Sequence, residues 1–184
     1  MSERNTLARS ARDLGAAAWF GGSLMGAVGL NGATAQATSS PEALRLSAVG
    51  WQRWAPVNAA AIALHTVGGI GLIIGNRRRL ENQEEAQGNT ATKAVLTVVA
   101  LGLSAYSGAL GKKVFDKSDD TVKGVTEPSV ATDSDLAAAQ KQLRWCQWAI
   151  PAVTGVLVVL GAQQGEQQRP GQQARGALKK PFSS

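Results

Sequence analysis

The sequence predicts an all-α integral membrane protein, built as a bundle of four transmembrane helices. The charged residues gather outside four stretches that contain no Asp, Glu, Lys or Arg. These stretches run from residue 14 up to Glu42, over Ala55–Asn76, over Ala94–Gly111 and over Trp145–Gly165. A bilayer core needs roughly 20 apolar residues of helix, with a range of about 17–25. A second observation is that a paired-tryptophan pattern precedes two of the stretches, which indicates a repeated design.

The alternative is a water-soluble helical bundle, and the mean hydropathy of −0.07 suits such a protein. Each uncharged stretch, however, contains several glycines. Gly costs about 1 kcal/mol relative to Ala inside a helix in water. Membrane helices tolerate Gly and use it where helices touch. The glycine content therefore favours the membrane protein.

The first predicted span covers residues 14–34 and follows a basic segment. Small residues at Ala33-Thr34-Ala35 also fit the cleavage site of a signal peptide, which is the alternative for this segment. The apolar run is longer than the usual signal-peptide core of about 7–15 residues, which favours a retained helix. Gly22, Gly26 and Gly29 recur on one face of it, and we expect this face to pack against another helix.

The second predicted span covers residues 55–75. A short interfacial helix precedes it within residues 35–53, with Ser40 as its cap and Pro41 in its first turn. Trp51 and Trp54 are predicted to anchor the chain at the membrane interface, because indole rings are half wet there.

His65 lies inside the second span and is the single histidine of the chain. An ionisable side chain within a span is by default a candidate functional site. We expect a structural imidazole, hydrogen-bonded within the bundle to Asn58 or to Ser104. The alternative is a cofactor site for haem or quinone that uses His65 and Asn58. Gly68 and Gly75 share the same helix face and are predicted packing positions.

The third and fourth predicted spans cover residues 94–111 and 145–162. Ser104 and Gly108 mark the packing face of the third span. A polar turn over residues 76–93 precedes it. A longer connection over residues 114–144 follows, and its second half reads as helix. Trp145 and Trp148 open the fourth span as a second pair of interface anchors, again after a short interfacial helix.

The recurring tryptophan pairs indicate two duplicated helical hairpins. The distance from Ser40 to Trp51 equals the distance from Ser134 to Trp145. Hairpins in the same orientation imply a pseudo-twofold axis along the membrane normal. The membrane domain is predicted to cover residues 1–165, followed by a disordered basic cytoplasmic tail at 166–184, which has too little apolar content to pack.

The charges predict a multi-pass protein of the cell (inner or plasma) membrane with both termini in the cytoplasm. The segments placed inside hold more Lys and Arg than those placed outside, as the positive-inside rule requires. The net charge of +6 lies beside the spans, which favours anionic lipid headgroups over nucleic acid as the partner.

No nucleophile–base pair, phosphate loop or membrane-embedded acid is visible, and one cysteine excludes an internal disulfide. We therefore expect a non-enzymatic accessory or interaction subunit that forms homo-oligomers or joins a larger membrane complex. The alternatives are a haem- or quinone-binding membrane protein and a small-solute permease.

In size and layout, including the run Trp19-Phe20-Gly21-Gly22, the chain resembles small four-helix bacterial membrane proteins of unassigned function. It is similar in size to the DoxX and anthrone-oxygenase-like groups. This resemblance implies a four-helix membrane fold and assigns no site residue.

Overall fold

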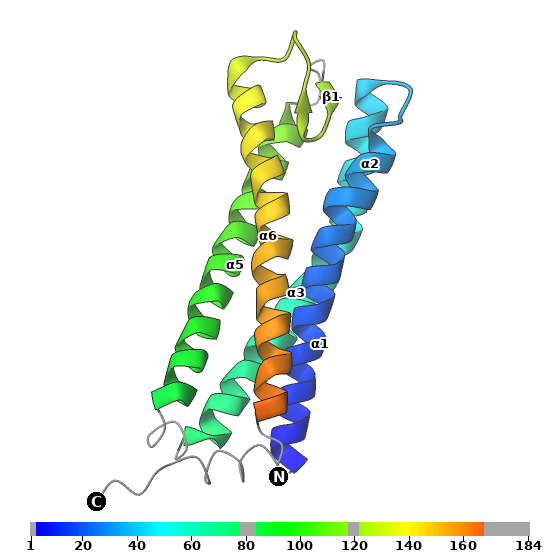
Figure 1. The fold of residues 1–184 in the computed structure, drawn as a ribbon. Helices are drawn as coiled ribbons and strands as arrows, with labels where there is room; N and C mark the ends of the chain where they lie inside the picture. Colours follow the sequence, from blue (N-terminus) through cyan, green and yellow to red (C-terminus); the bar gives the residue numbers. More distant parts are fainter. Residues whose placement is uncertain (1–2, 78–83, 118–121, 168–184) are drawn as a thin grey trace, which may run out of the picture.

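The computed structural model of the chain describes residues 3–77, 84–117 and 122–167. Helix α1 (Glu3–Met25), the π-helix η1 (Gly26–Leu30) and helix α2 (Asn31–Thr34) follow one another without a break, and α3 (Ser40–Gly75), α5 (Glu84–Asp116) and α6 (Ser134–Gln167) are long single helices. Figure 1 shows that α3, α5, α6 and the rod formed by α1, η1 and α2 lie side by side and alternate in direction. The predicted all-α class is confirmed, apart from a small antiparallel pair of strands, β1 (Val122–Gly124) and β2 (Glu127–Pro128).

Three helices of the described chain are long and apolar enough to cross a membrane. They cover Ser40–Gly75, Gln87–Asp116 and Ser134–Gln163, and so include the predicted second, third and fourth spans. The predicted first span, residues 14–34, is helical but is not among the three. Helix α1, which forms most of it, mixes small, polar and charged residues with the apolar ones. A fourth span therefore stays a prediction.

The boundaries of the elements differ from the prediction in two ways. The interfacial helices are not separate elements, because α3 and α6 each run unbroken through their prolines, Pro56 and Pro151. The predicted polar turn at 76–93 is also shorter, since α5 begins at Glu84. The cap of α3 is Ser39, one residue before the predicted Ser40, and its hydroxyl accepts a bond from the Glu42 N–H. The predicted tail lies outside the described residues from 168 onward.

The four rods do not pack equally against one another. Helix α1 packs extensively against α3 and also against α6, and α5 packs against α6, whereas α3 and α5 touch sparsely. A twofold axis relating the two hairpins would give α3 and α5 the same contact as α1 and α6. The bundle is instead open between α3 and α5, so the pairing of helices is not symmetric.

Helices α1 and α3 approach closely at two glycines. A Cβ atom at Gly15 would lie 2.5 Å from the carbonyl oxygen of Ala61, and one at Gly68 would lie 2.6 Å from that of Ala8. These are backbone atoms, so a side chain at either position would force the two helices apart. The missing Cβ atoms thus fix the distance between α1 and α3.

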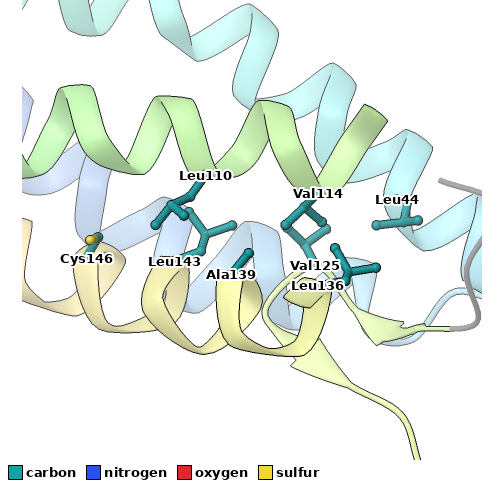
Figure 2. Packing of buried hydrophobic residues seen from close by; sticks show 8 residues of the cluster. All are labelled: Leu44, Leu110, Val114, Val125, Leu136, Ala139, Leu143 and Cys146. Atoms are coloured by element: carbon teal, nitrogen blue, oxygen red, sulfur yellow. The ribbon is translucent and has the colours of Figure 1, made fainter. Parts of the chain in front are cut away.

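The larger hydrophobic cluster lies at the end of the bundle that carries the strands. Figure 2 shows how Leu110 and Val114 of α5 meet Leu136, Leu143 and neighbouring side chains of α6. Val125, between the two strands, packs into the same cluster. The side-chain amide of Gln140 donates to the Gly124 carbonyl at 2.8 Å and ties the strands to α6.

A smaller cluster lies between the helices and is centred on Trp19 of α1. It joins Trp19 to Ala61 of α3, Ala100 of α5 and Ile150 of α6. The indole N–H of Trp19 donates to the Ser104 hydroxyl at 3.2 Å. This bond satisfies the polar atom of a fully buried ring, as burial of an indole requires.

Candidate functional site

His65 lies where α1, α3 and α5 meet. Its side chain is 6% exposed, and both ring nitrogens have partners on other helices. Nδ1 lies 3.0 Å from the Arg12 carbonyl oxygen of α1, and Nε2 lies 3.1 Å from the Thr97 hydroxyl of α5. The ring of Trp19 meets the imidazole edge-on, with centroids 6.2 Å apart. His65 therefore links three helices, and its bond to Thr97 bridges the opening between α3 and α5.

The partners of His65 fix its tautomer. A carbonyl oxygen can only accept, so Nδ1 carries the proton and donates to Arg12. In the neutral ring Nε2 then accepts, and the Thr97 hydroxyl donates to it. The same hydroxyl also lies 2.8 Å from the Lys93 carbonyl oxygen, which competes for its one proton. An iron ion at Nε2 would have to displace Thr97.

A cavity of about 310 Å³ lies beside His65, between α1, α3 and α5. One end of it is charged. Three cationic side chains and one carboxylate line this end: Arg9, Arg12 and Asp13 of α1 and Lys93 of α5. Arg12 bonds to Asp13 through Nε at 2.9 Å and through Nη2 at 2.7 Å. The charged end is therefore basic and partly ordered by its own ion pair.

Helix α6 leaves room for this ion pair. A Cβ atom at Gly161 would lie 3.2 Å from the Asp13 carboxylate and 3.4 Å from the Arg12 guanidinium. The Arg12 side chain is 9% exposed and that of Asp13 is 46% exposed. A buried guanidinium needs a partner of this kind, because an unpaired charge in a bundle is costly.

The rest of the first cavity is lined by polar side chains, among them Thr66, Asn89 and Thr97, and by apolar side chains. The larger apolar side chains come mainly from α3 and α5, with Ile70 and Ile73 on one side and Val98 and Leu101 on the other. Ile70, Ile73 and Val98 are exposed, as large hydrophobic side chains rarely are in clusters on a soluble surface. The cavity thus combines one cationic end with an uncovered apolar channel.

A second cavity, of about 700 Å³, lies further along the opening between α3 and α5 and adjoins the first at Leu101. Trp51, Trp54 and Asn58 of α3 line it. The indole nitrogens of both tryptophans and the Asn58 carbonyl oxygen are buried without a hydrogen-bond partner in the described part of the chain. Lys112 is the one charged side chain among its lining residues, so this cavity lacks a strongly charged end.

The structure separates the two predicted cofactor residues. His65 lines the first cavity and Asn58 lines the second, about two helical turns away. They do not form one site. The Asn58 and Ser104 side chains that were candidate partners of His65 are replaced in that role by Arg12 and Thr97.

The predicted glycine faces lie in different surroundings. Gly68 meets the backbone of α1, while Gly22 and Gly26 give space to the rings of Trp54 and Trp51. A Cβ at Gly29 would meet only Met25 of its own helix, and one at Gly108 would meet nothing within 4 Å. Gly75 is exposed.

The two tryptophan pairs are also placed differently. Trp51 and Trp54 are half-buried, with their rings turned onto α1. Trp145 is 78% exposed and Trp148 is 49% exposed, so both point away from the bundle. Each pair begins eleven residues after the start of its helix, α3 or α6, at the same end of the bundle.

Sequence reasoning did not identify the basic end of the first cavity. Arg9 and Arg12 were assigned to a flank before the first span, and Lys93 to a loop, whereas the structure places all three within helices α1 and α5. The helical spacing of Arg9 and Arg12, three residues apart, is the one signal that puts them on a common face.

No group of three or more His, Cys, Asp or Glu side chains within the described ranges could hold a metal ion. Comparison of the chain with protein-family models, curated proteins and solved structures found no match. The resemblance in size to the DoxX and anthrone-oxygenase-like groups therefore stays a prediction.

Proposed function

We propose that this chain is an integral membrane protein that works as a non-enzymatic interaction or accessory subunit. The observation that carries the proposal is the exposure of its apolar helices. Within the bundle, only 17% of the most apolar 18-residue stretch of α3 is buried, and only 11% of the corresponding stretch of α5. Surfaces of this kind need lipid or other membrane helices around them.

In this proposal all four rods cross the cell membrane, and the N- and C-termini lie in the cytoplasm. The start of α1, which carries Arg9 and Arg12, and the start of α5, which carries Lys93, lie at the same end of the bundle as the last turn of α3, which Arg77 follows. The positive-inside rule assigns a basic end to the cytoplasm. The exposed Trp145 and Trp148 then lie toward the outer interface. We also propose that the two helix pairs, α1 with α3 and α5 with α6, arose by duplication of one helical hairpin.

The partner surface in this proposal is the outward face of α5. Val95, Val99 and Tyr106 are exposed on it, and a Cβ atom at Gly102 would meet nothing within 4 Å. Small residues between apolar ones allow a neighbouring helix to approach closely. The partner is a second copy of the chain or the helix of another membrane subunit.

Native mass spectrometry of the full-length protein, extracted from its membranes in mild detergent, tests this function. We expect the chain in a complex, and we expect Gly102→Leu to shift it toward the single chain. Gly21→Leu is the matched control, because a Cβ at Gly21 also meets nothing within 4 Å but lies on α1. A single chain without partners in every mild extract would refute the interaction function.

A second candidate function is the binding of haem or quinone in the cavity beside His65. The apolar channel and the imidazole at its wall favour it. The bonds of both ring nitrogens disfavour iron ligation, because one of them would have to break. A Soret band in the purified protein that disappears in His65→Ala would support haem, and a colourless preparation would exclude it.

A further inference from the structure

The second cavity is lined by side chains whose polar atoms have no partner in the described part of the chain. Trp51 and Trp54 of α3 line it, and their indole N–H groups are buried without an acceptor. The carbonyl oxygen of Asn58, about one helical turn further along α3, also lacks a hydrogen bond. A buried polar group without a partner is costly, so these atoms would gain from a molecule that supplies partners.

The packing of the two tryptophans against the α1 rod does not use their N–H groups. A Cβ atom at Gly22 would lie nearest to the six-membered ring of Trp54, and one at Gly26 nearest to that of Trp51. Because neither nitrogen has a hydrogen bond to lose, a small rotation of either ring toward a ligand breaks none. The two donors can therefore turn to a molecule in the cavity.

Helix α5 contributes hydroxyl groups to the same cavity. The Ser104 oxygen accepts the bond from the Trp19 indole, so its own proton can be donated to a ligand. Ser107 lines the cavity about one turn further along α5. The indoles, the amide and the hydroxyls are dipoles without formal charge. They suit an uncharged acceptor such as a carbonyl oxygen, because a buried charge would need a charged partner.

The backbone of the α1 rod is irregular beside this cavity. Ser23 lines the cavity about one turn before η1, and Gly26 is the first residue of that π-helix. Single π-turns within helices are rare and lie frequently at functional sites. Here Gly26 gives space to the ring of Trp51, which lines the cavity. The π-turn is thus a second feature, independent of the unpartnered atoms, that marks this region as a site.

Aromatic side chains indicate the shape of the ligand. Trp51, Trp54 and Phe115 line the cavity, and aromatic rings favour stacked or edge-on contacts with another ring. The volume of about 700 Å³ lies within the range of about 300–1,000 Å³ that is usual for small-molecule sites. We infer that the second cavity binds an uncharged planar ring that carries carbonyl oxygens, a compound of the quinone class, with its oxygens at the indole N–H groups.

This inference rests on the proposed membrane location, because its ligand is lipid-soluble, but not on the interaction function. It also differs from the second candidate function in the cavity that holds the ring. His65 lines the first cavity and not the second, whereas Asn58 lines the second and not the first. The two sites therefore predict different effects of the same variants.

Isothermal titration calorimetry of the purified full-length protein in one detergent tests the ligand class. The probes are a dimethylnaphthoquinone, the corresponding dimethylnaphthalene without the oxygens, and dioctanoylglycerol, which has ester carbonyls but no ring. We expect the naphthoquinone to bind about tenfold more tightly than either, as two hydrogen bonds to a stacked ring provide. Equal binding of dimethylnaphthalene would show an apolar cavity only, and equal binding of dioctanoylglycerol would show a lipid site. Either result, or no binding of the naphthoquinone, would overturn the inference.

A pair of tryptophan variants tests the hydrogen bonds. Trp54→Phe removes one N–H group and keeps an aromatic ring, so it should weaken naphthoquinone binding about fivefold, the effect of one hydrogen bond. Trp148→Phe is the matched control, because Trp148 is exposed on α6 and does not line the cavity. Equal affinity of the two variants would contradict the proposed contact.

A pair of glycine variants tests the location and separates the two proposals. Gly108→Leu should block the cavity, since Gly108 lines it and a Cβ there meets nothing within 4 Å. Gly102→Leu on the same helix lines neither cavity, so it should lose the complex and keep the ligand. Binding of the naphthoquinone by Gly108→Leu as by the wild type would refute the site, even where the Gly102-dependent complex is observed. If no complex forms but Gly108→Leu and Trp54→Phe weaken binding, the site stands and the interaction function fails.

His65→Gln distinguishes the two cavities. We expect this variant to bind the naphthoquinone as the wild type does, because His65 does not line the second cavity. Loss of binding in His65→Gln, together with full binding in Trp54→Phe and Gly108→Leu, would place the ring in the first cavity and overturn the inference.

Discussion

At the scale of single residues, the absence of a β-carbon decides how closely α1 and α3 approach. Gly15 and Gly68 each place a backbone hydrogen where a methyl group would overlap the main chain of the partner helix. Main-chain atoms cannot rotate away as a side chain can. The contact between these helices is therefore sensitive to single substitutions at the two positions.

Gly68→Ala tests this contact. The added methyl group would meet the carbonyl of Ala8 and the amide of Arg12, so we expect a loss of about 1–3 kcal/mol in the free energy of unfolding. Gly69→Ala, one residue along α3, should be neutral or stabilising, because a Cβ there meets nothing and Ala favours the helix. Detergent-induced unfolding followed by circular dichroism measures both. Equal stability of the two variants would contradict the close approach.

Asp133 is a second residue with a defined local role, ahead of α6 and outside the apolar helices. Its carboxylate accepts from the N–H groups of Asp135 at 3.0 Å and Leu136 at 3.3 Å. The bond from Leu136, followed by that from Asp135, holds the pKa of the Asp133 carboxyl below its ordinary value. A lowered pKa means that the folded chain favours the ionised carboxylate.

The carboxylate should thus add stability above the unfolded pKa of about 3.9, and this contribution should be lost as the pH falls through the lower folded pKa. We expect Asp133→Ala to be less stable than the wild type at neutral pH, with the difference shrinking below about pH 4. Thermal unfolding of both proteins across this range is the measurement. A difference that does not change with pH would mean that the carboxylate charge is not involved. Asp133→Asn, which retains a capping oxygen, is the control.

The sequence predicted one residue of the candidate site, His65, but not its partners or the basic end of the cavity. The single imidazole in an uncharged stretch marked His65 from its composition alone, and the structure places it in the wall of a cavity. Its partners were not predictable, because the carbonyl of Arg12 and the hydroxyl of Thr97 come from helices whose rotation no local pattern fixes. The basic end was missed because the helices extend through segments assigned to a flank and a loop.

At the scale of elements, α3 continues through Pro56, and the packing before this proline gives a physical reason. Pro56 follows Trp51 and Trp54 closely, and their rings fit over Gly26 of η1 and Gly22 of α1. This packing holds the turn before the proline in line. The interfacial and membrane parts therefore form one helix, which a proline rule applied to sequence alone does not anticipate.

The two strands and α6 form one unit through Gln140. Its side chain is fully buried, and its amide donates to the Gly124 carbonyl at 2.8 Å. Gln140→Met removes the donor and leaves that carbonyl without it, at a cost of about 1–3 kcal/mol. We expect faster hydrogen exchange and proteolysis at residues 122–128, with α5 unaffected. Lys141→Met, an exposed neighbour, should leave both rates unchanged, and equal protection in the two variants would show that the bond does not hold the strands.

At the scale of the whole molecule, the sequence predicted the all-α class and three helices that are long and apolar enough to cross a membrane, and both are confirmed. The distribution of charges is sufficient for this prediction, because a long uncharged helix can be recognised in the sequence without knowing which helices pack against it. The arrangement of the helices was not readable. The repeated tryptophan spacing suggested symmetric hairpins, yet Trp51 and Trp54 turn onto α1 while Trp145 and Trp148 face outward. Equal spacing in the chain does not fix the same environment in the bundle.

The position of α1 decides how many times the chain crosses the membrane. Helix α1 packs against both α3 and α6 and runs along the bundle, although its own residues are less apolar. If it crosses with the others, Ser10 and Thr38 lie on opposite sides of the membrane. If it does not, they lie on the same side, and the termini are separated by three spans.

Labelling of single cysteines with a membrane-impermeant maleimide distinguishes these arrangements. In a Cys146→Ala background, Thr38→Cys and Val130→Cys are exposed positions at the end that carries the strands, and Ser10→Cys is exposed near the opposite end. We expect the first two to react in intact cells and Ser10→Cys to react only after lysis, because the basic end faces the cytoplasm. Reaction of Ser10→Cys and Thr38→Cys together in intact cells would show that α1 does not cross. Reaction of Ser10→Cys alone would reverse the orientation and place the basic end of the bundle outside the cell.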